Sequence, residues 1–410
     1  MAGIENRAIE LHRKRRGKLE VASKVDCKSQ EGLALAYTPG VAAVSREIAK
    51  NPLKVYEFTI KWNSVAVVSD GSRVLGLGNI GPLAALPVME GKSALFKSYA
   101  KIDAFPICLS CQDEEGIVSA VKAISPSFGG INLEDIESPK CFEVEKRLVE
   151  ELDIPVFHDD QHGTAVVVLA GLKNALKVVG KKKEETRVVV SGAGAAGSAI
   201  AKLLSSDGFG EILVCDSKGI LYLEENLPPY KAELARLNKR EEQGSLADAL
   251  KGADVMVGAS APNIIGEKEV ASMASSPIVF ALSNPIPEID PKIAKKAGVA
   301  VFGTARADLP NQINNVLGFP GIFRGALMVR SKKIDEGMKL AAANAIAGVL
   351  GENEISPDFV VPPAFDPRVV PFVAKAVSKA AIESGQAREK KSEKQIQEEL
   401  EELGLLEKAQ

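Results

Sequence analysis

Residues 187–197 read RVVVSGAGAAG, a short β-rich run followed at once by glycines spaced G-x-G-x-x-G. A dinucleotide site needs a strand, a glycine turn that lets the backbone approach the pyrophosphate, a helix N-terminus facing it, and an acid that ends the next strand. We expect the helix at residues 198–204, and Asp216 closes the next β-rich run at 211–215. The predicted cofactor contacts are Gly192, Gly194, Ala195, Ala196, Gly197 and Asp216.

A second match to the glycine pattern, GLGNIG at residues 76–81, means that the pattern alone decides nothing. Pro82 follows this match directly, and its only comparably spaced acid, Asp103, comes before a β-rich run and not at its end. We therefore predict that residues 76–81 form a loop of a different, substrate-binding domain.

The acid at position 216 also bears on which dinucleotide binds. An aspartate there accepts hydrogen bonds from the ribose 2′-hydroxyl and repels a 2′-phosphate, which favours NAD over NADP. Lys218, two residues later, offers a positive charge and keeps NADP possible.

The rest of the chain is arranged around this unit as α/β sequence. Further β-rich runs at 254–257, 278–282 and 299–302 predict a Rossmann-like, doubly wound parallel sheet. Upstream, β-rich runs at 65–68, 105–107 and 130–133 alternate with helical stretches, one opening near Lys92. An apolar run at 166–179 predicts a long buried helix that links the two parts. The predicted divisions are an N-terminal α/β substrate domain at 1–162, the dinucleotide-binding domain at 163–384, and a charged C-terminal helix or tail at 385–410.

The composition of the chain limits the kinds of molecule that it is expected to bind. The 51 basic and 54 acidic residues give a net charge of -3, so no excess charge attracts nucleic acid or a membrane surface. Five cysteines are too few for a disulfide framework, and Cys108 and Cys111, although spaced like a redox pair, follow an expected buried strand. The sequence shows no leader segment and no stretch that approaches the length of a membrane span, so we expect a cytoplasmic protein that acts on small molecules. We interpret the basic run at 12–18 as a solvated helix end.

Two β-rich runs of the first domain end in acidic pairs, Glu134-Asp135 and Asp159-Asp160. Carboxyl ends of parallel strands share one sheet edge, and carboxylates that gather there favour a bound cation. Oxygen ligands suit Mg²⁺ or Mn²⁺. Two alternatives remain open: a zinc site that uses His158 and His162, and a helix-start cap for the first acidic pair.

At these residues the chain resembles the malic enzymes, particularly the short prokaryotic form, over about residues 35–372. The resemblance is carried by seven motifs in order: AYTPGV (36–41), SDGSRVLGLG (69–78), MEGK (89–92), NLED (132–135), HDDQHGT (158–164), SNP (283–285) and NNVLGFPG (314–321).

The resemblance implies oxidation and decarboxylation of malate to pyruvate and CO₂, with hydride transfer to NAD or NADP and a divalent metal. By motif, it assigns the metal ligands Glu134, Asp135 and Asp160, the general base Lys92, the general acid Tyr37, an orienting Asp159, the substrate ligand Arg73, and Asn284 and Asn315 for the substrate or nicotinamide end. It also implies a homodimer through the N-terminal segment, with Tyr37 reaching the neighbouring cleft. We expect Lys92 to be partly neutral through burial and cationic neighbours.

Two rival functions use the same residues. One is an oxaloacetate decarboxylase without net redox chemistry, against which the complete glycine fingerprint argues. The other is a non-catalytic nucleotide-sensing module, which would have little need for Lys92, Tyr37 and three acids together. Without the family context, Arg73 and Lys92 would be interpreted as surface residues and Tyr37 as a core tyrosine.

Overall fold

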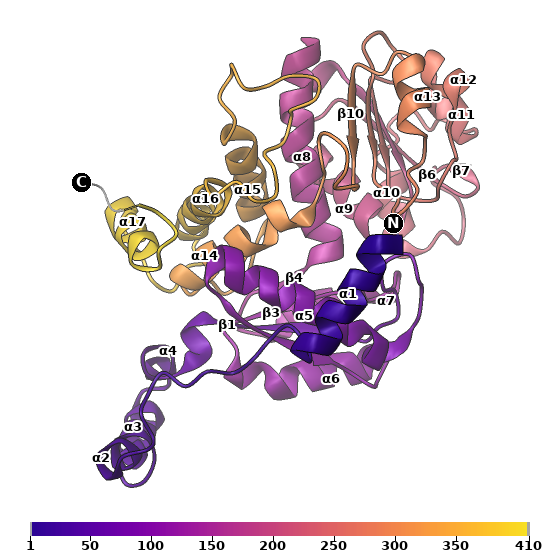
Figure 1. Ribbon diagram of the computed structural model, residues 1–410. Helices are drawn as coiled ribbons and strands as arrows, with labels where there is room; N and C mark the ends of the chain where they lie inside the picture. Colours follow the sequence, from indigo (N-terminus) through magenta and orange to yellow (C-terminus); the bar gives the residue numbers. More distant parts are fainter. Residues whose placement is uncertain (1, 408–410) are drawn as a thin grey trace.

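Two separate sheets, one parallel and one mainly parallel, organise the protein, whose computed structural model describes residues 2–407 (Figure 1). The first has four parallel strands in the order β2-β1-β3-β4. Its strands are β1 (Ser64–Ser69), β2 (Asp103–Cys108), β3 (Gly130–Leu133) and β4 (Val156–His158). β2 is an edge strand whose six residues are all partly exposed, so our expectation of a buried strand before Cys108 is wrong.

The second sheet has six strands in the order β10-β9-β8-β5-β6-β7. The strands are β5 (Arg187–Ser191), β6 (Glu211–Asp216), β7 (Gly219–Ile220), β8 (Val255–Gly258), β9 (Ile278–Ala281) and β10 (Val301–Thr304). β5 pairs with β6 on one side and β8 on the other, which places the topological switch point at the end of β5. The predicted Rossmann-like sheet is thus confirmed, with an antiparallel edge strand, β7, too short to show in the sequence.

Helix α8 (Asp159–Val179) joins the two sheets, and Figure 1 shows it rising from the end of β4 and running alongside the second sheet. It begins directly after β4, earlier than the apolar run that we used to predict it. By length and composition it could cross a membrane, which contradicts our expectation that no stretch approaches that length. Most of its apolar side chains are instead buried inside the protein.

Other helices differ from expectation at their ends. α5 (Gly81–Ala100) begins beside Pro82, a residue suited to a first helical turn, so Lys92 lies in its interior and not near its start. α9 (Ala195–Ser206) begins within the glycine motif. The helix after Glu134-Asp135, α7 (Lys140–Glu151), begins only at Lys140, so this pair does not cap a helix start.

The C-terminal helices pack against both parts. The Phe96 ring of α5 lies 4.7 Å from that of Phe319 and 5.3 Å from that of Phe323. Phe319 and Phe323 belong to α14, which also packs on α16. α15 packs on α8. The bounds are α14 (Phe319–Met328), α15 (Glu336–Gly348), α16 (Val369–Glu383) and α17 (Glu393–Glu402). One core cluster therefore runs through both domains.

The remaining helices cover the sheets or extend from the body. Those on the sheets are α6 (Glu114–Ile124), α10 (Pro229–Ala235), α11 (Leu246–Leu250), α12 (Glu267–Ala271) and α13 (Pro291–Lys296). The N-terminal ones are α1 (Ala2–Arg15), α2 (Gln30–Ala36), α3 (Val41–Lys50) and α4 (Val55–Phe58).

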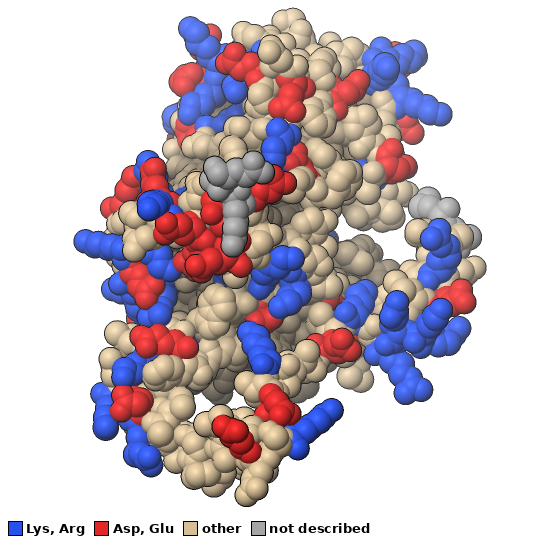
Figure 2. All heavy atoms as spheres, turned by 60° about the vertical axis from the view of Figure 1, so that its left-hand side comes forward, with Lys and Arg blue, Asp and Glu red and all other residues tan. Residues whose placement is uncertain are grey.

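The N-terminal segment forms an arm, defined here as residues 26–51, that projects from the body (Figure 1). Exposed apolar side chains lie along it, namely Leu33, Leu35, Tyr37, Val41 and Val44. α1 before it ends in exposed basic residues, as predicted for a solvated helix end, and Figure 2 shows them gathered on that helix.

Candidate active site

Three carboxylates meet at the carboxyl edge of the first sheet. β3 and β4 are neighbours with Leu133 opposite His158, so the residues after each strand come together. One oxygen from each of Glu134, Asp135 and Asp160 lies within 4.8 Å of the other two. The three predicted metal ligands therefore form one cluster.

The electrostatics of this cluster favour a cation. Burial, with the negative charge of Asp160 beside it, raises the pKa of Asp135 to about 7. Burial also raises the pKa of Glu134 well above its usual range. One buried oxygen of Asp135 has no hydrogen-bond partner among residues 2–407. An all-oxygen set with an unpartnered ligand atom fits Mg²⁺ or Mn²⁺.

Zinc fits less well, because the histidines lie outside this cluster. His158 Nε2 lies 3.2 Å from Asp160 Oδ2, and His162 Nε2 contacts Glu145 Oε2 at 2.9 Å. Within residues 2–407, the carboxylate cluster includes no histidine. The zinc alternative is therefore not supported.

Lys92 lies beside the cluster and is buried. Its Nζ is 2.7 Å from Asp159 Oδ2 and 3.0 Å from Glu134 Oε1, and it lies over the ring of Phe319. Burial lowers the pKa of Lys92, but Asp159 and Glu134 together raise it further, so the net direction is upward. Our expectation of a cationic neighbourhood is wrong, because the charged groups that contact Lys92 are the acids Asp159 and Glu134.

Asn315 joins the same group from the C-terminal half of the chain. Its side-chain amide donates to Asp159 Oδ2, the oxygen that also accepts from Lys92. Asp159 thus has the neighbours expected of a residue that orients Lys92.

The glycine turn has the shape that a dinucleotide needs. Gly192 has φ +116°, and a Cβ there would lie 2.3 Å from the carbonyl oxygen of Ala259. A Cβ on Gly197 would lie 1.9 Å from the carbonyl oxygen of Gly192. Gly194, at the start of α9, faces open space, since a Cβ added there would meet no atom of the described chain within 4 Å beyond its own neighbours. Two glycines therefore permit the turn, and the third leaves room for a pyrophosphate at the helix N-terminus.

The two domains approach each other at the mouth of the site. A Cβ on Gly76 would lie 3.2 Å from the backbone oxygen of Asn284. The first glycine match is therefore a loop of the first domain, as predicted, and it faces the SNP motif of the second. Asn284 is exposed at this point.

Arg73 and Tyr37 differ in their distance from the cluster. The Arg73 backbone N–H donates to the Asp135 carbonyl at 3.1 Å, and its exposed side chain forms no salt bridge with any residue in 2–407. Tyr37 is 66% exposed on the arm. The structure does not bring Tyr37 to Lys92 of its own chain.

Comparison with known protein families identifies the family of this chain. The profile described as malic enzyme, N-terminal domain, matches residues 16–149, and that described as malic enzyme, NAD binding domain, matches residues 161–382. The chain belongs to the malic enzyme family.

Its relatives include both cofactor types. A bifunctional malic/malolactic enzyme of Bacillus subtilis is 54% identical, over 94% of this chain and 95% of that protein. An NAD-dependent malic enzyme of Geobacillus stearothermophilus is 56% identical, over 91% and 78%. An NADP-dependent malic enzyme of Escherichia coli is 47% identical over 90% of this chain, which spans about half of that longer protein. The crystal structure of malic enzyme from Pyrococcus horikoshii superposes with a TM-score of 0.92 at 49% identity, covering 98% of this chain and 95% of that one.

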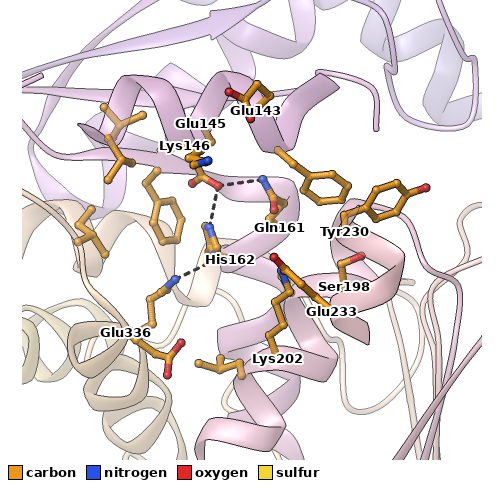
Figure 3. A pocket seen from close by; sticks show the side chains of 18 of the residues that line it. Glu143, Glu145, Lys146, Gln161, His162, Ser198, Lys202, Tyr230, Glu233 and Glu336 are labelled. Atoms are coloured by element: carbon orange, nitrogen blue, oxygen red, sulfur yellow. Dashed lines mark hydrogen bonds and ion pairs between the residues drawn. The ribbon is translucent and has the colours of Figure 1, made fainter. Parts of the chain in front are cut away.

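The sequence analysis did not identify Glu145, whose hydrogen bonds support this malic enzyme site. Glu145 accepts hydrogen bonds from the backbone N–H of His158, the Gln161 amide and the His162 ring, each at 2.9 Å. Figure 3 shows these side chains converging beside a cavity of about 510 Å³ between α7 and α9. Lys339 contacts His162 from the far side at 3.3 Å. Glu145 thereby fixes the β4–α8 junction that carries Asp159 and Asp160, and nothing in its local sequence signals this.

Glu288 is a second missed residue. Its fully buried carboxylate accepts the N–H groups of Ser260 at 3.1 Å and Ser283 at 3.0 Å. It therefore ties together the loops after β8 and β9, including the loop that carries Asn284.

Proposed function

We propose that this malic enzyme oxidises and decarboxylates malate to pyruvate and CO₂, using a divalent metal and NAD or NADP, in the cytoplasm. The observation that carries the proposal is the convergence of Lys92, Asp159 and the carboxylates Glu134, Asp135 and Asp160 at one sheet edge. Family membership and the open glycine turn support it.

When bound, a divalent cation would stabilise negative charge on the substrate oxygens, and the dinucleotide would accept the hydride. Lys92 receives the proton of the malate hydroxyl as the hydride leaves. Glu134, Asp135 and Asp160 would hold the metal. Because Glu134 helps to keep Lys92 protonated, a metal bound to Glu134 would lower the pKa of Lys92 toward the range of a general base. Asp159 holds Nζ in place throughout.

The substrate carboxylates need a positive group at the mouth of the site. Arg73 is suited to this because its backbone is fixed to Asp135 while its guanidinium has no carboxylate partner among residues 2–407. Asn284 and Asn315 come from the second half of the chain and would bind the substrate or the nicotinamide end.

The last step is protonation of C3 of enolpyruvate, which requires an acid. Tyr37 is the proposed acid, and we infer that it acts in the cleft of a second copy within a homodimer. The exposed apolar side chains of the arm support such an interface.

The direct test is to incubate the purified protein with malate, Mn²⁺ and either cofactor. We expect reduced nicotinamide and pyruvate to appear in equal amounts. Pyruvate from added oxaloacetate without any malate oxidation would favour the decarboxylase instead, and nucleotide binding without either reaction would favour the sensing module.

A further inference from the structure

We propose that Lys140 is a positioning residue for malate binding, because its ion pair with Asp70 fixes the loop that carries Arg73 against the loop of the proposed metal ligands. The inference rests on the proposed function and goes beyond it by assigning the residue that holds Arg73 at its distance from the metal site. It starts from an ion pair in which Lys140 Nζ lies 2.6 Å from Asp70 Oδ2.

Asp70 lies at the sheet edge that carries the carboxylate cluster. It directly follows β1, the strand that pairs with β3, and its side chain is fully buried. Oδ1 accepts the backbone N–H of Ser72 at 3.0 Å and the Ser72 hydroxyl at 2.7 Å. Among residues 2–407, the Lys140 ammonium is the one charged partner of Oδ2, and no other group donates to this oxygen. Loss of Lys140 would therefore leave a buried carboxylate charge uncompensated.

The position of Lys140 on its helix is unfavourable apart from its contacts. It is the first residue of α7, where the helix dipole favours an acid over a base. Besides Asp70, its Nζ contacts Glu137 Oε1 at 3.5 Å and donates to the backbone carbonyl of Gln112 at 2.8 Å. The Gln112 side-chain amide in turn donates to the Asp70 carbonyl at 3.0 Å. These contacts fix the ammonium, whose side chain is only 13% exposed, and so account for a lysine at this helix start.

Ser72 links the ion pair to the loop of the metal ligands. Its side-chain oxygen accepts the backbone N–H of Glu137 at 3.0 Å, and the next residue, Arg73, donates its own backbone N–H to the Asp135 carbonyl at 3.1 Å. The loop after β3 leads directly into α7, so the ion pair and these two bonds close a ring that joins the two loops. The backbone of Arg73 is thereby fixed beside a proposed metal ligand.

This ring matters for a substrate that is held at two points. Malate bound to the metal would present its carboxylate to Arg73 at one separation only, and a clamp of this kind is effective when its two sides are fixed relative to each other. The Arg73 side chain is exposed and has no carboxylate partner among residues 2–407, so its placement depends on its backbone. Lys140 should therefore affect malate through Arg73.

The test is a double-mutant cycle between Lys140→Met and Arg73→Gln. Calorimetry would measure malate binding in the presence of Mn²⁺ and NADH, because NADH occupies the nucleotide site without accepting a hydride. The proteins compared are the unaltered chain, the two single variants, the double variant and Lys140→Arg. Lys146→Met is the matched control, because Lys146 is exposed on the same helix.

Arg73→Gln and Lys140→Met should each weaken malate binding at least about tenfold, as expected for loss of one charge-assisted contact. The double variant should bind malate within about threefold of Arg73→Gln alone, since Lys140 acts through Arg73. Lys140→Arg should stay within about threefold of the unaltered protein, because a guanidinium also pairs with a carboxylate. The control should bind malate normally.

Ser72→Ala gives a second route that leaves Lys140 and Asp70 paired. It removes the hydroxyl link to the metal-ligand loop, and it decides the question if Lys140→Met does not fold. Ser72→Ala should weaken malate binding at least about threefold in the native background and not in the Arg73→Gln background. The unfolding temperature of each variant would show that folded protein is being compared.

Effects of Lys140→Met or Ser72→Ala that multiply with that of Arg73→Gln would overturn the proposal, since these residues would then act on the whole site. Unchanged malate binding in folded Lys140→Met would overturn it as well. The expected coupling in a protein that does not oxidise malate would sustain this inference while refuting the proposed reaction. Failure of the unaltered protein to bind malate would refute the proposed substrate and this inference with it.

Discussion

Lys92 Nζ and Asp159 Oδ2 lie 2.7 Å apart in a buried ion pair, and Asp159 itself is fully buried. This pair joins α5 to the start of α8 and so holds the proposed base against the carboxylate cluster. Replacing Lys92 with Met should lower kcat for malate oxidation by about 10²–10⁴-fold, the usual contribution of a general base. Lys97→Met, on the exposed side of the same helix, should leave kcat unchanged. A Lys92→Met enzyme with near-normal kcat would exclude Lys92 as the base.

Asp160→Ala should abolish metal-dependent turnover while largely sparing NADH binding. Asp160 is the proposed metal ligand on α8, and it also accepts the Asp135 N–H at 2.8 Å. Its loss would therefore remove one proposed ligand and loosen another. Mn²⁺ binding followed by electron paramagnetic resonance would measure the first effect and NADH fluorescence the second. Normal Mn²⁺ affinity would remove Asp160 from the metal shell.

Tyr37→Phe and Lys92→Met should complement each other when mixed. If Tyr37 acts across subunits, a heterodimer contains one cleft with both native residues and one cleft with neither. Mixing two inactive variants under conditions that allow subunit exchange should therefore restore up to about one quarter of native activity. Random exchange makes about half of the dimers heterodimers, and one of the two clefts in each heterodimer is complete. No recovery despite demonstrated exchange would place Tyr37 in the cleft of its own chain or outside the chemistry.

Much of this site followed from local sequence, and the exceptions have a common cause. The strands and the glycine turn are local patterns, and parallel strands that end together brought Glu134, Asp135 and Asp160 to one edge as predicted. The pKa of Lys92 depends on Asp159 and Glu134, which lie far from it in the chain, so its direction required the structure. Glu145 and Glu288 were missed for the same reason: each acts through partners supplied by other elements.

Glu145 should make stability depend on pH in the acidic range. Burial acts to raise its pKa, but His162, His158 and their hydrogen bonds outweigh burial and lower the pKa to about 2. A depressed pKa means that the ionised group stabilises the fold above its unfolded pKa near 4.5, and that this contribution is lost as pH falls toward 2.

The corresponding variant is Glu145→Gln. Urea unfolding should show it to be less stable than the native protein at pH 6 by about 1–3 kcal/mol, as for a buried hydrogen-bonded charge, and the difference should shrink at pH 3.5. Glu143→Gln, exposed on the same helix, is the control and should show no such trend. A difference that stays constant with pH would indicate a packing role without the ion pair.

Gly194 and Gly197 should respond differently to the same substitution. Gly194 has an ordinary φ of -84° and open space around it, so Gly194→Ala should leave the unfolding temperature unchanged. Its methyl group would occupy the space where the pyrophosphate approaches, and we expect the KM for NAD to rise about tenfold or more. Gly197→Ala places its Cβ 1.9 Å from the Gly192 carbonyl oxygen, so the turn must deform and the unfolding temperature should fall. Calorimetry on both variants, with NAD titrations of the folded protein, separates the two effects. A stable Gly194→Ala enzyme with unchanged KM would mean that the dinucleotide does not cross this turn.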